Sequence, residues 1–90
     1  MLQAKNFIDG SAVDSSNIID VLNPATEEAF AQCHFGDANM VDAAVKAARE
    51  AFPAWAATPD EERKAMLMEI AGLIEKNMPD LMAMVTQESG

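Results

Sequence analysis

One stretch decides the fold of this chain: DANMVDAAVKAAREAFPAWAATPDEER, residues 37–63. Its first part places apolar side chains at the i, i+3, i+4, i+7 spacing of a single buried helix face; these are Val41, Ala44, Val45, Ala48 and Phe52. Asp37 is suited to the N-cap because its carboxylate can accept hydrogen bonds from the first unpaired backbone N–H groups. The pattern therefore predicts an amphipathic helix over residues 37–52.

The end of this helix and the start of the next are both predicted at prolines. Pro53 should end the first helix, because the residue before a proline is disfavoured in the α conformation. After it, Thr58 and Pro59 match a capping-box threonine and a proline at the first helical position, with a glutamate three residues on from the threonine. We expect two helices that meet at a corner built around Trp55 and that persist as a pair.

Two further helices are predicted after this corner, over residues 59–77 and 79–88, with a break at Pro79. The apolar stripe of the first of them contains Met66, Leu67, Ile70, Ala71 and Ile74. In the last one, Leu81-Met82-Ala83-Met84-Val85 has no polar side. A helix that is apolar all round is normally buried on every side, and a chain of ninety residues can hardly surround it. We therefore expect that its covering surface lies outside this chain.

The first 36 residues contain strand and turn signals instead of helix signals. Asp9-Gly10 predicts a type I′ turn, which pairs the strands on either side of it. A second strand pair is predicted from residues 18–22 and about 28–35, joined by Asn23-Pro24-Ala25-Thr26 and closed by Gly36. Strands followed by helices indicate an α+β fold. We expect short antiparallel β-hairpins over residues 1–36 and three α-helices over residues 37–90, together one incomplete domain.

Cys33 and His34 are the only thiol and the only imidazole of the chain. Their adjacency suggests a nucleophile and its base, but neighbours on a strand point to opposite faces of the sheet. Period two places Ala31, Cys33 and Phe35 on one face and Phe30, Gln32 and His34 on the other. We expect a buried structural cysteine and a histidine with a surface or packing role. No residues are predicted to be catalytic or to bind a cofactor.

Charge and composition exclude several classes of function. Fifteen acidic residues against six basic ones give a formal net charge of −9, which opposes binding to the phosphates of nucleic acids. No stretch has the apolar length of a membrane span, and no signal peptide pattern is present. With one cysteine there is no internal disulfide, which favours a reducing compartment. These observations predict a cytoplasmic protein without nucleic-acid or membrane partners.

Several segments, in this order and spacing, resemble the N-terminal part of the aldehyde dehydrogenase superfamily. The matching segments are Phe7-Ile8-Asp9-Gly10, residues 21–28, residues 41–52 with Trp55, Glu62-Arg63, residues 70–75, Leu81 and residues 86–90. The family usually has a glycine where Glu27 or Glu28 stands here. The resemblance implies a segment packed on the α/β Rossmann-like cofactor domain of a longer enzyme. That enzyme would use NAD or NADP to oxidise a small aldehyde, such as a semialdehyde, to a carboxylic acid, and would form a homo-oligomer.

The resemblance implies the catalytic and cofactor residues downstream of the position that matches Gly90. The chain alone should therefore be inactive and bind no dinucleotide. Several family members hold a monovalent cation between backbone carbonyls and a carboxylate, at positions that match Val21, Leu22 and Glu88. The alternative for Glu88 is an ordinary acid at the C-terminal end of a helix.

A different function class stays open at this point. The chain could be a free-standing small α+β module that docks a partner protein through its apolar third helix. In either case the apolar segment around Met82 and Val85 should drive self-association of the isolated chain, because contiguous apolar patches rarely remain exposed to water.

Overall fold

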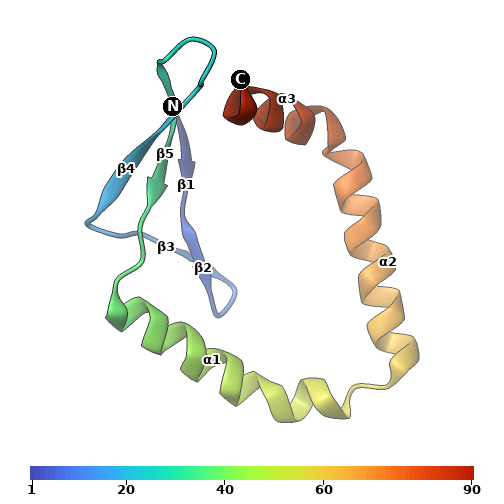
Figure 1. The fold of residues 1–90 in the computed structure, drawn as a ribbon. Helices are drawn as coiled ribbons and strands as arrows, with labels where there is room; N and C mark the ends of the chain where they lie inside the picture. Colours follow the sequence, from blue (N-terminus) through green and yellow to red (C-terminus); the bar gives the residue numbers. More distant parts are fainter.

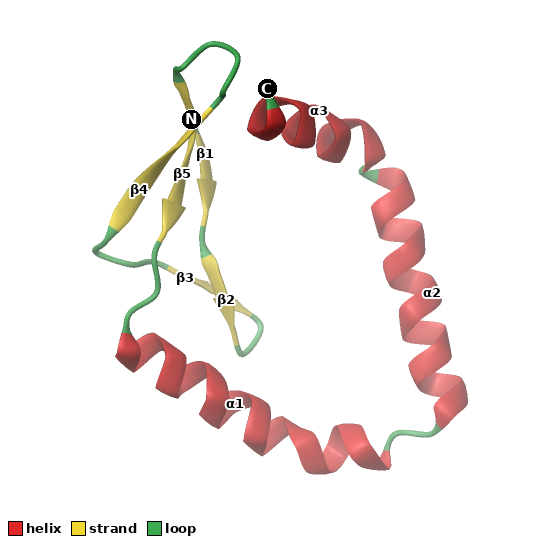
Figure 2. Ribbon diagram, viewed as in Figure 1, coloured by secondary structure: helices red, strands yellow, loops and turns green.

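The computed structural model describes residues 1–90 and shows five strands followed by three helices (Figure 2). The strands are β1 (Leu2–Ala4), β2 (Asn6–Ile8), β3 (Ser11–Val13), β4 (Ile18–Leu22) and β5 (Ala29–His34). The helices are α1 (Ala38–Ala57), α2 (Asp60–Lys76) and α3 (Met78–Ser89). The α+β class and the order of strands before helices, both predicted from the sequence, are confirmed.

Three strands form one sheet in the order β1-β5-β4. The β4–β5 pair is antiparallel as predicted, with Ile19 opposite Cys33. Strand β1 pairs in parallel with β5, with Leu2 opposite Ala31. The sequence did not predict β1, because three residues are too few to show a period and a parallel partner is far away along the chain.

The hairpin predicted at Asp9-Gly10 is present as the antiparallel pair β2–β3, with Ile8 opposite Ser11. Both turn residues have positive φ, 51° at Asp9 and 77° at Gly10, as a type I′ turn requires. The hairpin lies against α1 (Figure 1). It is therefore the part of the strand region that positions the first helix.

The β4–β5 connection contains the predicted turn and one irregularity that was not predicted. Asn23 Oδ1 accepts a hydrogen bond from the Ala25 N–H at 2.9 Å, which fixes the Asn-Pro turn. Glu27 has φ of 61°, in the left-handed region. Val21 pairs with Ala31 but Leu22 pairs with Ala29, so Phe30 is the extra residue of a β-bulge.

The bulge corrects the predicted assignment of one side chain to a sheet face. Phe30 lines the same cavity as Ala31 and Cys33, and not the opposite face with Gln32 and His34. An extra residue in one strand shifts the alternation of side chains by one position. A period-two reading of the sequence could not include that shift.

The predicted end of the first helix was wrong. Helix α1 continues through Pro53 to Ala57, and Asp37 is its N-cap, with a carboxylate oxygen that accepts the Met40 N–H at 2.8 Å. A proline inside a helix removes one backbone hydrogen bond and strains the preceding turn. Here it lies among alanines, which have the highest helix propensity, and the helix ends one turn later at Thr58.

The predicted capping box was also wrong. The Thr58 hydroxyl donates to the Ala54 carbonyl at 2.9 Å, back into α1, so it does not cap α2. Pro59 is the N-cap residue of α2 and makes no side-chain hydrogen bond. The corner is therefore made by Thr58 and Pro59, while Trp55 lies in the last turn of α1 and is 48% exposed.

The bounds of the last two helices lie within one residue of the predicted ranges 59–77 and 79–88. Asn77 separates α2 from α3, and its side-chain amide donates to the Leu73 carbonyl at 2.8 Å. Pro79 then lies in the first turn of α3, where a backbone N–H has no partner within the helix and its loss costs little. Proline thus begins the third helix here and does not end the second.

The helices form an open arc that starts at the strands, turns at the Thr58–Pro59 corner and returns toward β1 with α3 (Figure 1). The extents are 48 × 34 × 16 Å and the radius of gyration is 16.7 Å, against about 12 Å for a compact domain of this length. The accessible surface is 7225 Å², about 2,100 Å² more than a compact protein of this mass exposes. None of the helices is long and apolar enough to span a bilayer.

Only two residues, Ala31 and His34, are buried, and both lie on β5. No residue of α1, α2 or α3 is buried, so the helix faces that the sequence predicted to be buried are exposed. Helices α1 and α2 diverge from their corner and do not pack as a pair (Figure 1). The predicted periodicity is present, but the chain contains no second layer to cover it.

Candidate functional site

The three-stranded sheet has one apolar face, which α3 approaches. Between them is a cavity of about 180 Å³ lined by Leu2, Ala4, Val21, Phe30, Ala31, Cys33, Met84 and Glu88. The end of α3 lies close to the Asn-Pro turn, because a Cβ placed on Gly90 would be 3.2 Å from the Ala25 nitrogen. Gly90 also has φ of 84°, so two conditions favour glycine there.

The residues predicted to hold a cation are only partly brought together. Val21 and Glu88 line the same cavity, whereas Leu22 is absent from its lining and is 54% exposed. Glu88 is the only charged residue of that lining, and the structure has no cluster of three acidic, histidine or cysteine side chains. Hard cations bind several oxygen ligands at once. Within this cavity the chain therefore presents a single carboxylate, that of Glu88.

The opposite face of the sheet is polar and is organised around His34. The Ser15 backbone N–H donates to His34 Nδ1 at 2.9 Å, and His34 Nε2 lies 3.0 Å from Gln3 Oε1. The Asn6 amide donates to the His34 carbonyl at 3.1 Å. Cys33 lines the cavity on the other face. The two side chains therefore cannot act as nucleophile and base, and His34 has a packing role.

One ion pair accompanies this polar face. Lys5 Nζ lies 2.7 Å from a carboxylate oxygen of Asp14, and both side chains are largely exposed. The hydrogen bond from Lys5 and its positive charge hold the pKa of Asp14 below its usual value. The pair joins the end of β1 to the loop after β3.

Many large apolar side chains of the helices and of the β2–β3 hairpin are exposed. A groove of about 310 Å³ lies between the β2–β3 hairpin and α1, lined by Phe7, Ile8, Asp9, Ala44, Ala47, Ala48 and Ala51. A second groove of about 300 Å³ lies on α3, lined by Met78, Leu81, Met82, Val85 and Thr86. The sequence predicted the second from its uninterrupted apolar run. It did not predict the first, because no local pattern shows which helix face a distant hairpin will meet.

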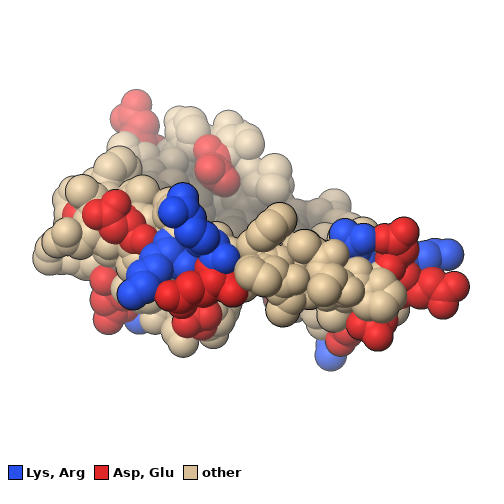
Figure 3. All heavy atoms as spheres, turned by 90° about the horizontal axis from the view of Figure 1, so that it is seen from below, with Lys and Arg blue, Asp and Glu red and all other residues tan.

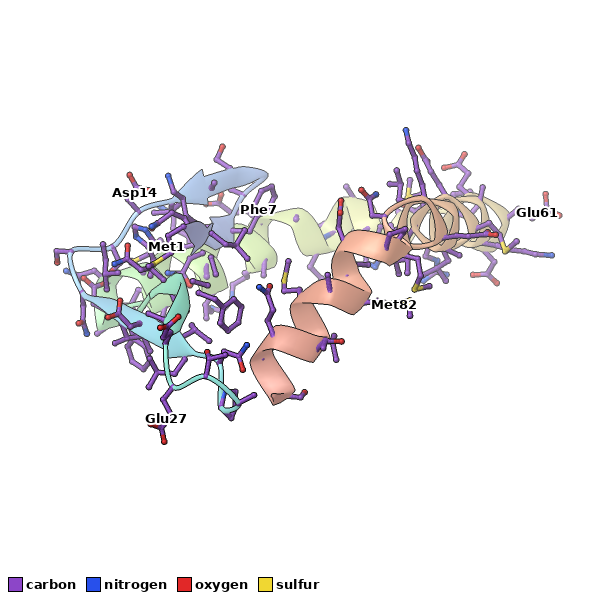
Figure 4. All side chains as sticks on the ribbon, turned by 90° about the horizontal axis from the view of Figure 1, so that it is seen from above. Met1, Phe7, Asp14, Glu27, Glu61 and Met82 are labelled. Atoms are coloured by element: carbon purple, nitrogen blue, oxygen red, sulfur yellow. The ribbon has the colours of Figure 1, made fainter.

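The charged residues lie on either side of an uncharged part of the surface. Seen from below, Lys, Arg, Asp and Glu gather on one part of α1, and an uncharged stretch follows before charges resume on α2 (Figure 3). Between Glu50 and Asp60 the sequence contains no charged residue, and Phe52 and Trp55 in this segment are 65% and 48% exposed. Side chains of α2 point outward all round the helix axis, and Met82 lies on the outer side of α3 (Figure 4). Such apolar surfaces usually mark contacts with another protein surface.

Comparison with known proteins identifies the family. The sequence model of the aldehyde dehydrogenase family matches residues 11–90. The chain is 34% identical over 90 residues to human 2-aminomuconic semialdehyde dehydrogenase, covering 100% of this chain and 18% of that protein. It is 41% identical over 87 residues to the acylating, mitochondrial methylmalonate-semialdehyde dehydrogenase of Arabidopsis thaliana, covering 94% of this chain and 14% of that protein.

A solved structure agrees with these relatives. The crystal structure of an aldehyde dehydrogenase from Bartonella henselae superimposes with a TM-score of 0.91 at 31% sequence identity, covering 97% of this chain and 19% of that chain. The chain thus spans less than a fifth of the length of these relatives. It belongs to the aldehyde dehydrogenase family, and it corresponds to an N-terminal segment of such an enzyme.

Proposed function

We propose that this chain is a structural segment of an NAD(P)-dependent aldehyde dehydrogenase and that its open apolar surface packs on the remainder of that enzyme. One observation carries the proposal: the apolar faces of α1, α2 and α3 are exposed although the sequence patterns them for burial. The surface in excess of a compact fold is about 2,100 Å². A standard protein interface takes about 800 Å² from each partner, so the excess is sufficient for a stable intramolecular contact.

The activity that we propose belongs to the longer enzyme. It would oxidise an aldehyde to a carboxylic acid with NAD or NADP as cofactor. The named relatives are semialdehyde dehydrogenases, which supports a semialdehyde as substrate. In this proposal the chain contributes no catalytic and no cofactor-binding residue; it supplies a scaffold on the outside of the cofactor domain. Homo-oligomeric assembly and a cytoplasmic location remain predictions from the sequence.

A graft tests the proposal. Residues 1–90 replace the matching segment of the Escherichia coli 5-carboxymethyl-2-hydroxymuconate semialdehyde dehydrogenase, to which the chain is 34% identical over 90 residues. We expect a soluble chimera that retains dehydrogenase activity within about tenfold. The same graft with Leu81→Glu and Val85→Glu should lose activity and stability, because α3 could no longer pack. Gln87→Glu is the matched control on the same helix.

The alternative hypothesis, a free-standing module that binds a partner protein, predicts different outcomes for the graft. A module that serves a different partner would give an inactive or insoluble chimera, with no difference between the substituted graft and its control. The isolated chain provides a second measurement. Titration with NAD and NADP by calorimetry should show no saturable binding tighter than roughly millimolar. Tighter binding would show that the chain contributes directly to the cofactor site.

We also propose that Glu88 contributes to a monovalent cation site completed by the remainder of the enzyme. The shared cavity of Val21 and Glu88 supports this, and the backbone carbonyls of Val21 and Leu22 would be the other ligands from this chain. In the chimera, K⁺ or Na⁺ should raise the melting temperature, and Glu88→Gln should remove that effect. An equal response in both chimeras would leave Glu88 as an ordinary acid at the end of α3.

A further inference from the structure

A series of hydrogen bonds crosses the polar face of the sheet from one edge of the fold to the other. It runs from the Ser15 N–H to His34 Nδ1 at 2.9 Å, and from His34 Nε2 to Gln3 Oε1 at 3.0 Å. It continues from Gln3 Nε2 to Gln32 Oε1 at 2.7 Å and from Gln32 Nε2 to Asp20 Oδ1 at 3.3 Å. The series therefore links the loop after β3 with β5, β1 and β4.

The two ends of the series fix the direction of every bond in it. A backbone N–H can only donate, so His34 Nδ1 must be an acceptor without a proton. An ionised carboxylate can only accept, so Gln32 must donate to Asp20, and its carbonyl oxygen accepts from Gln3. Gln3 Oε1 is then free to accept from His34 Nε2. The proton of the neutral ring is therefore on Nε2, and all four bonds point the same way.

A protonated imidazole does not fit this arrangement. Both ring nitrogens of a charged histidine are donors, so Nδ1–H would face the N–H of Ser15, which cannot move without moving the backbone. His34 is 7% exposed, so water has little access to replace the lost bond. Histidine is the side chain whose charge changes between pH 5 and 8. We propose that neutral His34 is a pH-sensitive latch that holds the Ser15 backbone amide on the sheet and releases that amide on acidification.

The charged groups linked to the ring are Asp14, its partner Lys5 and Asp20. Asp14, in the same loop as Ser15, is the nearby negative charge and is paired with Lys5. Asp20 on β4 reaches the ring only through two glutamines. Strand β1 and the Asn6 side chain bring no charge.

Other hydrogen bonds of the β3–β4 loop do not depend on the His34 ring. The Phe35 N–H donates to the Asn17 carbonyl at 2.8 Å, and the Ser15 hydroxyl donates to the Phe35 carbonyl. These bonds do not involve the ring and remain when it is protonated. The change on acidification is therefore centred on the Ser15 N–H, because Nε2 can donate to Gln3 in both states of the ring, and the β4–β5 pair stays intact.

The test compares the chain with two substitutions that each preserve one half of the latch. The amide oxygen of asparagine can replace Nδ1 as acceptor for Ser15, and the amide nitrogen of glutamine can replace Nε2 as donor to Gln3. Nitrogen-15 NMR of the unsubstituted chain at pH 7.5 should show the proton on Nε2 of His34. Between pH 7.5 and 5.0, the hydrogen-exchange protection factor of the Ser15 amide should fall roughly tenfold, while that of Cys33 in β5 is unchanged.

The substituted chains should separate the latch from general acid unfolding. In His34→Asn the Ser15 protection should persist at both pH values, and in His34→Gln it should be absent at both. A proton on Nδ1, or a freely exchanging ring at pH 7.5, would overturn the proposal. So would a Ser15 protection that falls equally with pH in the unsubstituted chain and in His34→Asn. Loss of Cys33 protection at pH 7.5 would also overturn it, because the sheet would then not hold the ring.

Discussion

The strand region and the helical arc of this chain differ in what stabilises them. The strands contain both buried residues, the sheet pairing and the hydrogen bonds that join residues far apart in the sequence. The helices contain no buried residue, and their side-chain hydrogen bonds are local, within a few residues. The strand region is thus specified by contacts inside the chain. The arc has regular backbone structure, but contacts inside the chain do not specify its packing.

The largest effect should come from the apolar surface of α3. Met82 and Val85 are more than 60% exposed, and each represents about 1.5–3 kcal/mol of burial that the isolated chain does not realise. We expect the isolated chain to form oligomers through this surface. Met82→Glu with Val85→Glu should lower the mass seen in analytical ultracentrifugation to that of a monomer, while Gln87→Glu should not. A monomeric unsubstituted chain would show that α3 is covered from within.

A pair of matched substitutions tests the two regions directly. Ala31→Asp places a charge at a site that is 4% exposed, which should cost several kcal/mol and unfold the sheet. Val45→Asp places the same charge on a face of α1 that is 53% exposed, and should change stability by less than about 1 kcal/mol. Circular dichroism with urea measures both. In the chimeric enzyme both should be damaging, because α1 would then be covered.

Helix α1 still depends on its N-cap, and substitutions at Asp37 can measure the contribution of that cap to stability. Its carboxylate accepts the Met40 N–H at 2.8 Å at the start of α1. Asp37→Ala should reduce stability by about 1 kcal/mol and fray the first turn of α1. Asp37→Asn is the control, because an asparagine oxygen can make the same hydrogen bond. Amide exchange at Met40 distinguishes them; equal protection in both variants would mean that the cap has no role.

Replacing Glu27 with glycine should relieve backbone strain in the strand region. A non-glycine residue with φ of 61° costs free energy that glycine does not. Glu27→Gly should therefore stabilise the chain by about 0.5–1 kcal/mol, although glycine gains freedom in the unfolded state. Glu28→Gly, in the same turn, should have no stabilising effect. The denaturation midpoints of the two variants, compared with that of the unsubstituted chain, give the sign.

The smallest effect concerns the exposed Lys5–Asp14 pair. Since the pKa of Asp14 is lower in the folded chain than its ordinary value of 3.8, the pair stabilises the fold above that value. This contribution is lost as the pH falls through the folded pKa. Lys5→Gln should return the pKa of Asp14 toward 3.8, which an NMR titration of its carboxyl carbon can follow. No shift in Lys5→Gln would mean that the ion pair does not form in solution.

Local signals in the sequence were sufficient for most of the backbone. Asp9-Gly10 determined a turn with two positive φ angles, the β-branched run at residues 18–22 determined β4, and Asn23-Pro24 determined the turn after it. Asp37 determined where α1 begins. Each of these features depends on residues within a few positions of one another, so the local sequence is sufficient to determine it.

Prolines were interpreted less well, because their effect depends on the neighbouring structure. Pro53 was expected to end α1 and lies within it, and Pro79 was expected to force the break before the third helix and lies in the first turn of that helix. The same ring restricts φ in both cases. Whether it breaks a helix depends on how much the surrounding turns gain from remaining helical. The rule that the residue before a proline is disfavoured in a helix does not include the free energy of the surrounding turns.

Only the tertiary structure decided the parts that join distant residues. Strand β1 is defined by its parallel partner near Ala31, and the faces of β5 are set by a bulge at Phe30. The orientation of His34 is fixed by Ser15 and Gln3, which are 19 and 31 residues away. The sequence by itself determined which helix faces are apolar and that they need a covering layer. Which surface covers them depends on long-range packing, since hydrophobic burial has no direction and cannot be assigned to a partner from a local pattern.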